Sequence, residues 1–454
     1  MDTGSLAARD IASHLHPFTN PLALERVPPL VIARGRGVRV YDEDGRDYIE
    51  GLAGLWCAAL GFGEERLAEA AAAQIRTLSF YHGFGGKSHE PVIRLAETLL
   101  RLSPVPMSKV FFANSGSEAN DTAVKLVRYY NNALGRPAKK KIIARDKAYH
   151  GVTVMTASLT GLPNNQRGFD VPLPGVLHTL CPHHYRFGRP GESEEAFAAR
   201  CADELEALIL AEGPDTVAAF FAEPVMGAGG VLIPPATYFA RIQDVLRRYD
   251  VLLVADEVIT GFGRTGHLFG CQTYDIRPDM ITVAKALSSG TLPISALLVS
   301  EPIYGAVRRQ SGEIGIFGHG YTYSGHPVAA AVALETLRIY EERDVVGHVR
   351  AVAPHFHDHL HAFASHPLVG EVRSVGLIGA IELVRDKATG EPFPASEGVG
   401  PMAVAQAQRH GLILRAMGDS VAFAPPLIIT TGELDELFAR FTRALEDTTR
   451  ALGS

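Results

Sequence analysis

Short apolar runs alternate with amphipathic stretches through the middle of the chain. The apolar runs are residues 109–114 (KVFFAN), 217–225 (VAAFFAEPV), 251–258 (VLLVADEV), 280–287 (MITVAKAL) and 295–300 (SALLVS). Helical patterns separate several of them, at residues 118–134 and 235–250. Continuous apolar strands bounded by helices are typical of a mostly parallel sheet that is covered on both faces. This part of the chain therefore predicts an α/β fold.

The pattern changes after Pro327. A long helix, roughly Val328 to Tyr340, is followed by strand-like residues 372–384 and 411–427 and by a closing amphipathic helix from about Glu433. These elements predict a smaller α+β unit, and the strand-like residues 30–50 are expected to pack with it. We predict an N-terminal segment at 1–60, a large domain at 61–326 and a small C-terminal domain at 327–454.

Composition indicates a soluble globular enzyme. The chain has 454 residues, 46% of them apolar and 20% charged, with a formal net charge of −7. That charge argues against a nucleic-acid or anionic-membrane partner, and no apolar run approaches the ~18 residues of a membrane span. The N-terminal residues, which include Asp2 and Asp10, are not typical of a secretory signal. Four cysteines without regular spacing indicate reduced thiols and a cytoplasmic location.

Lys285 stands directly after an apolar strand, where a lysine is costly. The chain has only nine lysines among its 43 basic residues, and Lys285 is the one lysine between Lys147 and Lys387. A lysine with its charged end in solvent is the ordinary interpretation of such a position. A desolvated lysine, however, is a better nucleophile, as Schiff-base chemistry requires.

Two other apolar strands also end in groups that suit a ligand. Residues 109–114 lead into Ser115, Gly116 and Ser117 just before a helix, an arrangement that suits a phosphate, although a capping box of Ser115 with Glu118 is also consistent. Asp256 lies near the end of the apolar run 251–258, where a carboxylate needs a cation as its partner. For the neighbouring Glu257, an ordinary acid reaching solvent is expected.

Together these three features indicate pyridoxal 5'-phosphate. The lysine forms the imine, the aspartate holds the pyridine nitrogen protonated, and the helix start binds the phosphate. The glycine-rich residues 261–266 (GFGRTG) also match a dinucleotide fingerprint, but no helical periodicity follows them, so we interpret them as a turn that shapes the site.

Several segments closely resemble the class III, or ω-, aminotransferases: LLVADEVITGFGRTG, ITVAKALSSG, NSGSEAND, AEPVMGAGGV and GHGYTYSGHP. The similarity extends from about Gly51 to the C-terminal helix. It implies a fold-type I pyridoxal-phosphate enzyme, with a large mostly parallel sheet domain and a smaller α+β domain, that forms a homodimer with active sites at the subunit interface.

The resemblance also implies roles for individual residues. Lys285 and Asp256 are the catalytic pair, and the cofactor site comprises Ser115, Gly116, Ser117, Tyr149, Glu223, Val258 and Thr322, the last from the neighbouring subunit. Tyr149 would stack on the pyridine ring with Val258 on its other face. Glu223 matches an acid near the cofactor whose role varies within the family.

The closest likeness is to the branch that uses pyruvate with ω-amino acids or amines. Ile259 stands where the ornithine and 4-aminobutyrate branches have glutamine, which counts against those two. The implied substrate pocket comprises Trp56, Phe84, Tyr149, Ala228 and Arg415, with Phe84 supplied by the partner subunit. Arg415 matches the arginine that pairs with a substrate carboxylate, for which a guanidinium is well suited.

Two histidine-rich segments were considered as metal sites. His355, His357, His359 and His361 form i,i+4 pairs if they are helical, and Cys181, His183 and His184 cluster in CPHHY. Neither completes a recognised ligand set, so no metal is predicted.

The sequence thus predicts a two-step amino transfer from a donor amine to a keto acid, with Lys285 as the proton shuttle. A decarboxylase or aminomutase with the same cofactor shares these residues, and a non-catalytic cofactor-bearing protein is a third hypothesis. The preferred donor stays open between β-alanine, taurine, a diamine and an aryl amine, as does the choice between dimer and tetramer.

Overall fold

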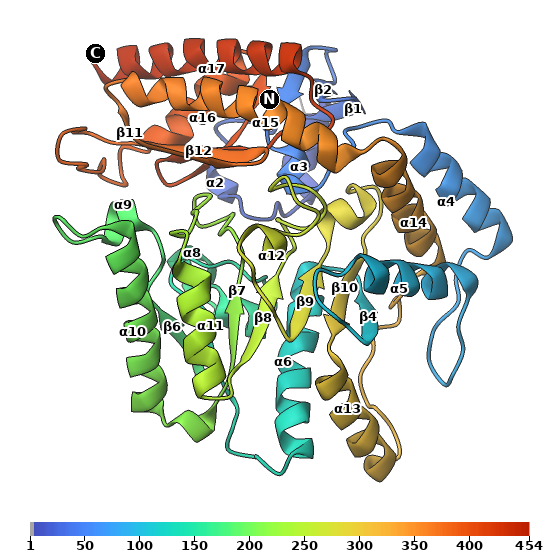
Figure 1. Cartoon of the computed structure of the whole chain (residues 1–454). Coiled ribbons are helices and arrows are strands. Elements are labelled where there is room, and N and C mark those ends of the chain that lie inside the picture. Colours follow the sequence, from blue (N-terminus) through green and yellow to red (C-terminus); the bar gives the residue numbers. More distant parts are fainter. Residues whose placement is uncertain (1–3, 454) are drawn as a thin grey trace.

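A seven-stranded sheet forms the centre of the structure, a computed structural model that describes residues 4–453 (Figure 1). The strand order is β4-β10-β9-β8-β7-β5-β6. The strands are β4 (Lys109–Ala113), β5 (Lys141–Arg145), β6 (Val176–Thr179), β7 (Val217–Ala222), β8 (Leu252–Asp256), β9 (Met280–Val283) and β10 (Ser295–Val299). Only β10 runs antiparallel to its neighbours. The predicted mostly parallel sheet is confirmed.

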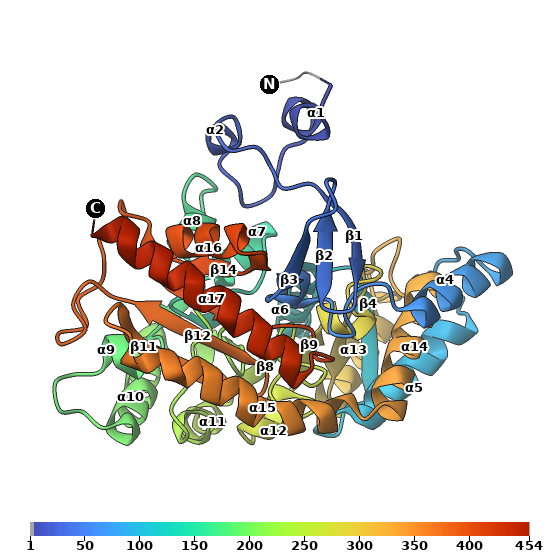
Figure 2. The same ribbon diagram turned by 90° about the horizontal axis from the view of Figure 1, so that it is seen from above.

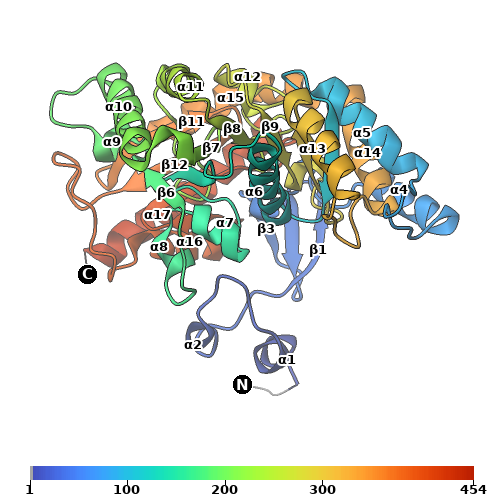
Figure 3. The same ribbon diagram turned by 90° about the horizontal axis from the view of Figure 1, so that it is seen from below.

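Helices cover both faces of this sheet, which explains why its strands are apolar throughout. Alternate residues of β8 enter different cores: Leu252 and Val254 pack with α6 and α7, whereas Leu253 and Ala255 pack with α10 and α11. Figure 3 shows the two helical layers on opposite sides. The helices of this region are α4 (Glu65–Thr77), α5 (Glu90–Leu102), α6 (Gly116–Ala133), α7 (Val154–Leu159), α8 (Pro163–Gln166), α9 (His184–Phe187), α10 (Glu194–Glu212), α11 (Tyr238–Arg248), α12 (Gly270–Thr273) and α13 (Glu301–Ile314).

A second, antiparallel sheet lies above the first in the view of Figure 1 and has the order β11-β12-β15-β14. Its strands are β11 (Val369–Val375), β12 (Ile378–Leu383), β14 (Arg415–Met417) and β15 (Ser420–Phe423). The helices after residue 326 are α14 (Pro327–Glu342), α15 (Val345–Ala362), α16 (Val399–Arg409) and α17 (Thr431–Leu452). Phe423 packs against Phe438 and Phe441 of α17, at ring-centroid distances of 5.7 and 4.9 Å, so this sheet has its own aromatic core.

A third sheet joins the two ends of the chain and has the order β1-β2-β3-β13. Its strands are β1 (Ile32–Arg36), β2 (Arg39–Asp42), β3 (Asp47–Glu50) and β13 (Leu412–Ile413). β13 runs parallel to β3, with Ile413 opposite Glu50. The chain before this sheet forms α1 (Leu6–Ser13) and α2 (Pro21–Leu24), which project from the body of the structure in Figure 2. The turn α3 (Ala53–Trp56) follows β3.

The helices predicted at 118–134, 235–250 and 328–340 correspond to α6, α11 and α14. The domain boundaries at residues 60 and 326 stay a prediction. Within residues 4–453, no helix is both long and apolar enough to cross a membrane.

Candidate active site

A cavity of about 690 Å³ lies at the carboxyl ends of the strands of the central sheet. This is where open α/β sheets bind ligands. A larger cavity of about 970 Å³, lined by residues of α4, α5, α14 and α15, holds none of the predicted site residues. The smaller cavity brings together most of them: Trp56, Ser115, Gly116, Ser117, Tyr149, Glu223, Ala228, Asp256, Val258, Lys285 and Arg415.

Lys285 reaches the cavity through a sharp change in backbone direction. Ala284 is extended, whereas Lys285 has a φ of 49° and begins a short 3-10 turn, Lys285–Ser288. Within residues 4–453 its Nζ makes no hydrogen bond or ion pair, and it lies 5.4 Å from the centroid of the Trp56 ring. Burial lowers the pKa of Lys285. The amine is therefore placed and tuned to react in its neutral form.

Asp256 is buried and held by three donors. Its Oδ2 accepts from Asn120 Nδ2 and His150 Nδ1, both at 2.8 Å, and its Oδ1 accepts from the backbone N–H of Val258 at 3.1 Å. His150 Nε2 is buried and has no partner within the described residues. These bonds fix the carboxylate at the cavity wall, where it is available to a cationic ring nitrogen.

Glu223 is buried at the end of β7 and connects two loops. Its Oε1 accepts from the N–H of Tyr149 and its Oε2 from the N–H of Gly227, both at 3.0 Å. Burial raises the pKa of Glu223, and the nearby His150 opposes that shift. Glu223 therefore positions Tyr149 as well as lining the cavity.

The start of α6 forms the predicted anion site. Ser115 is the N-cap, and its side chain accepts from the N–H of Glu118 at 3.2 Å. The Glu118 carboxylate accepts from the N–H and the side chain of Asn114, so the capping box expected for Ser115 and Glu118 is only half formed. A Cβ at Gly116 would lie 3.0 Å from Val258 Cγ2, so a side chain there would crowd the cavity wall. The free N–H groups at this helix start suit a phosphate.

The remaining wall of the cavity carries aromatic groups and one cation. Arg415 begins β14, and its Cζ lies 5.5 Å from the Trp56 ring centroid. Burial lowers the pKa of Arg415, and Tyr149 opposes that shift. No hydrogen bond or ion pair from the rest of the described chain engages this guanidinium. It is therefore available to a ligand carboxylate.

Two predicted residues lie outside this cavity. Phe84 is 49% exposed and packs near Gly320, while Thr322 is exposed on the segment that follows. The expectation that they serve the neighbouring subunit's site agrees with this placement but is not tested by a single chain.

The prediction that the Glu257 carboxylate reaches solvent is wrong. Glu257 is 1% exposed, and its carboxylate accepts from Thr260 Oγ1 and from the N–H groups of Gly270 and Cys271, at 2.9 and 2.6 Å for the latter two. The acid caps the short helix α12. The glycine-rich residues 261–266 do form a turn without a long helix after it, and Arg264 in that turn donates to the carbonyls of Leu377 and Pro425.

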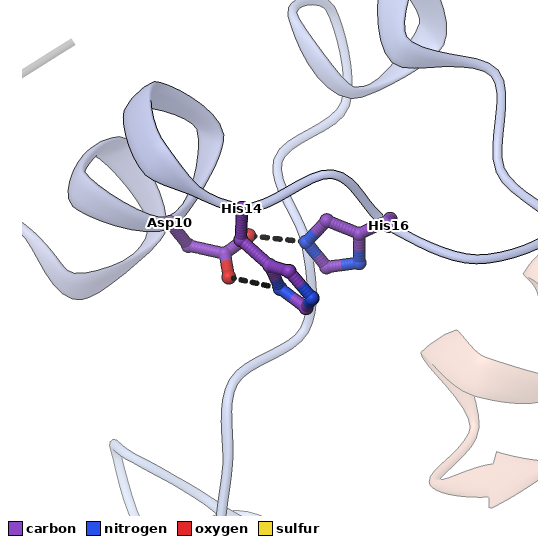
Figure 4. Close-up of side chains that lie close together, drawn as sticks. All are labelled: Asp10, His14 and His16. Carbon is purple, nitrogen blue, oxygen red and sulfur yellow. Dashed lines mark hydrogen bonds and ion pairs between the residues drawn. The ribbon is translucent and has the colours of Figure 1, made fainter.

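Three groups bring histidine and carboxylate atoms within 4.8 Å of one another in the described residues: Asp10–His14–His16 (Figure 4), His355–His359–Asp435 and His183–Glu371–Glu382. In each, imidazoles already bond to carboxylates. The Asp10 carboxylate bonds to both His14 and His16. Oδ1 of Asp435 lies 2.7 Å from Nε2 of His355 and 2.9 Å from Nε2 of His359. These contacts join neighbouring elements, and the absence of a metal stays a prediction.

Sequence reasoning missed Asn120 and His150. His150 follows Tyr149 directly, and Asn120 lies on the buried face of α6, so position alone gave a weak signal for each. Their common partner, Asp256, is more than 100 residues away in the chain.

Comparison with known proteins gives the same family as the sequence motifs. A family model described as aminotransferase class-III matches residues 23–445. The "Gamma aminobutyrate transaminase 3, chloroplastic" of Solanum lycopersicum is 52% identical over 96% of this chain and 84% of that protein. A thermostable ω-transaminase mutant from Pseudomonas jessenii is 57% identical, with a TM-score of 0.98 over 99% of this chain and all of that one. The Pseudomonas jessenii ω-transaminase in complex with PMP is equally similar and covers 99% of each chain.

We predict that His150→Phe weakens cofactor binding. The variant keeps a ring but removes one of three donors to a buried carboxylate, a loss that corresponds to roughly a tenfold or greater rise in the dissociation constant of pyridoxal phosphate. Titration of the cofactor-free protein with pyridoxal phosphate measures it. His178→Phe is the control, since His178 bonds to the Leu159 carbonyl and not to Asp256. Equal affinity of wild type and His150→Phe would show that this bond is dispensable.

Proposed function

The chain belongs to the class III aminotransferases, and on that basis we propose that it transfers an amino group from an ω-amino acid or amine to pyruvate. The observation that carries this proposal is the guanidinium of Arg415, which has no hydrogen bond or ion pair within residues 4–453 and lies in the same cavity as the equally unpaired amine of Lys285. A keto acid such as pyruvate and an amino acid donor both present a carboxylate. One cation that faces the reactive amine serves both in turn.

Class III aminotransferases use pyridoxal phosphate, and the residues of this cavity fit it. The N-terminus of α6, with Ser115, Gly116 and Ser117, would hold the phosphate, and Asp256 the ring nitrogen. Two buried polar atoms of residues that line the cavity, His150 Nε2 and Trp56 Nε1, have no partner in the described part of the chain, which is typical of a site built around a polar ligand. The cofactor supplies an aldehyde for the amine and a cationic ring that withdraws electrons.

Lys285 performs the proton transfer in this proposal. Its Nζ, whose pKa is lowered by burial, takes a proton from the donor carbon and returns one at the end of each half of the reaction. Three donated hydrogen bonds orient the Asp256 carboxylate toward the site where it would hold the ring nitrogen. Trp56 and Ile259 exclude water from the pocket, in which each is less than 8% exposed.

The donor is not fixed by these residues. The isoleucine at position 259 counts against 4-aminobutyrate as the donor, yet the similar plant proteins are named as transaminases of that compound. We therefore propose a set of ω-amino acid donors that includes 4-aminobutyrate together with β-alanine, and amines without a carboxylate as a second class. The cavity's apolar wall of Trp56, Ala228 and Ile259 supports the second class.

We also propose a homodimer with shared active sites. Large apolar side chains are exposed around the two residues that the cavity lacks: Phe80, Tyr81, Phe84, Ile316 and Tyr323. Gathered apolar side chains of this size are typical of a protein–protein contact. A cytoplasmic location is proposed as well, supported by four free cysteines.

The direct test is a panel of donors with pyruvate, in which alanine is measured as product. The wild type is expected to form alanine with at least one ω-amino acid. Lys285→Ala is expected to lose turnover by several orders of magnitude, because both the amine and the proton shuttle are removed. Multiple turnovers by this variant without added amine, or release of carbon dioxide in place of alanine, would contradict the proposal.

The variant Arg415→Leu is expected to distinguish donors that carry a carboxylate from donors that do not. Loss of the guanidinium is expected to raise KM for pyruvate and for ω-amino acids about tenfold or more, since a charge-assisted bidentate contact is lost. The KM of an amine without a carboxylate is expected to change little when its own half-reaction is followed by cofactor absorbance. Arg277→Leu, at an exposed position, is the control. Equal effects on both donor classes would contradict the assigned role of Arg415.

A dimer predicts that Phe84 affects catalysis although it lies outside the cavity of its own chain. Light scattering is expected to give twice the chain mass of 48.8 kDa. Phe84→Ala is expected to change KM for the donor several-fold, whereas Leu210→Ala, an exposed apolar position on α10, is not. An active monomer would contradict the shared site.

A further inference from the structure

The residues Ala53 to Trp56 form one turn of left-handed α-helix. Their φ angles are 50°, 53°, 72° and 61°. The turn closes with helical hydrogen bonds of this hand, from Trp56 N–H to the Leu52 carbonyl at 2.7 Å and from Cys57 N–H to the Ala53 carbonyl at 2.9 Å. A left-handed turn is unfavourable at every residue that has a side chain, and three of these four do. The conformation therefore persists only because its surroundings hold it.

Glu50 makes the bonds that hold this turn. It is the last residue of β3 and is 7% exposed. Its Oε1 accepts from the N–H of Leu52 at 2.9 Å, and its carboxylate also accepts from the N–H of Gly54. These are amides at the start of the turn, which a left-handed helix leaves without a partner of its own.

The backbone around Glu50 is fixed on both sides. Glu50 N–H donates to the Val38 carbonyl, and Gly51 N–H to the Ile413 carbonyl, both at 2.9 Å. Ile413 lies two residues before Arg415 in the chain. A Cβ at Gly51 would lie 2.7 Å from Leu414 Cδ2, so a side chain there would displace the side chain of Leu414. Glu50 thus stands between the turn and the strand that leads to Arg415.

Glu50 has no counter-ion in the described residues. Arg39, on the adjacent strand β2, pairs with Asp47 and Glu436. Arg440 of α17 pairs with Asp47 and Glu436 as well. Lys285, Arg415 and Cys57, on the far side of the turn, make no bond to Glu50. Burial raises the pKa of Glu50 to about 7, although the two amides oppose that shift. A buried carboxyl group without a cation is unfavourable, so its acceptor role at the turn is the reason for it that the structure offers.

The turn determines where the only tryptophan of the chain lies. Trp56 is 2% exposed, and its ring has Lys285 Nζ at 5.4 Å and Arg415 Cζ at 5.5 Å. The indole is therefore in contact range of both the reactive amine and the cation that receives carboxylates. Rotation of the turn would move the indole relative to both groups.

We propose that Glu50 is a positioning residue: its carboxylate holds the left-handed turn Ala53–Trp56 and thereby fixes the indole of Trp56 beside Lys285 and Arg415. The positioning holds for any substrate. Its consequence for carboxylated donors rests on the function proposed above.

Fluorescence of the holoenzyme, excited selectively at the indole, reports on this position, because Trp56 is the only tryptophan of the chain. Glu50→Gln keeps the size of the side chain and removes its charge. We expect a shifted emission spectrum, stronger quenching by acrylamide, and a KM for ω-amino acids that rises several-fold while kcat changes less. We also expect the wild-type emission to titrate with a midpoint near pH 7, as the carboxylate forms, and this step to be absent in Glu50→Gln.

The control is Glu335→Gln, a similarly buried carboxylate that is bound by Arg66 and Arg338, far from the turn in the chain. Its emission is expected to match the wild type. If Glu50→Gln does not fold, Glu50→Asp keeps the charge but has a shorter side chain. Its emission, acrylamide quenching and KM are then compared with those of the wild type. Emission and pH titration that are identical in wild type and variant would overturn the proposal. Because fluorescence needs no turnover, this outcome is independent of whether any donor is transaminated.

Discussion

The whole site depends on removing one amine from water. A lysine in solvent is charged and does not attack a carbonyl carbon, and burial of Lys285 beyond β9 lowers its pKa. Burial is tolerated because the site supplies opposite charge at a distance: Asp256 and Glu223, at the ends of β8 and β7, both favour the charged form of the amine without bonding to it. The parallel strands bring these ends to one edge of the sheet. The parallel sheet therefore determines both where the amine is buried and which carboxylates lie near it.

Much of this arrangement was accessible from the sequence because it follows local rules. The runs at 251–258 and 280–287 are apolar on both faces, which only a doubly covered strand requires, and each ends in its functional residue. The helix after Ser115 carries its own cap. By contrast, β5 (KIIAR) and β6 (VLHT) were not predicted, because polar residues interrupt their apolar runs, although β5 precedes Tyr149 and His150 by only a few residues. The sequence of the antiparallel strand β10 is as apolar as the sequences of the parallel strands, because burial and not strand direction determines its composition.

The errors and omissions come from long-range contacts. Glu257 looked like a solvent-exposed acid because its partners, Gly270 and Cys271, offer only backbone N–H groups, which the sequence does not display. Asn120 and His150 acquire meaning only through Asp256. The left-handed turn at Trp56 is invisible for another reason: Ala, Leu and Trp are residues that avoid this conformation, and the tertiary structure overrides that preference.

The pairing of β3 with β13 has a consequence for how the enzyme is made. Trp56 and Arg415, whose side chains are in contact range in the cavity wall, are 359 residues apart, and β13 supplies the last strand of a sheet that begins at Ile32. On the ribosome, the N-terminal strands must wait for nearly the whole chain before their sheet can close. During that interval their apolar edge is unpaired. The order of synthesis thus leaves β3 without its partner strand β13 for longer than β1 and β2, which pair within the first 50 residues.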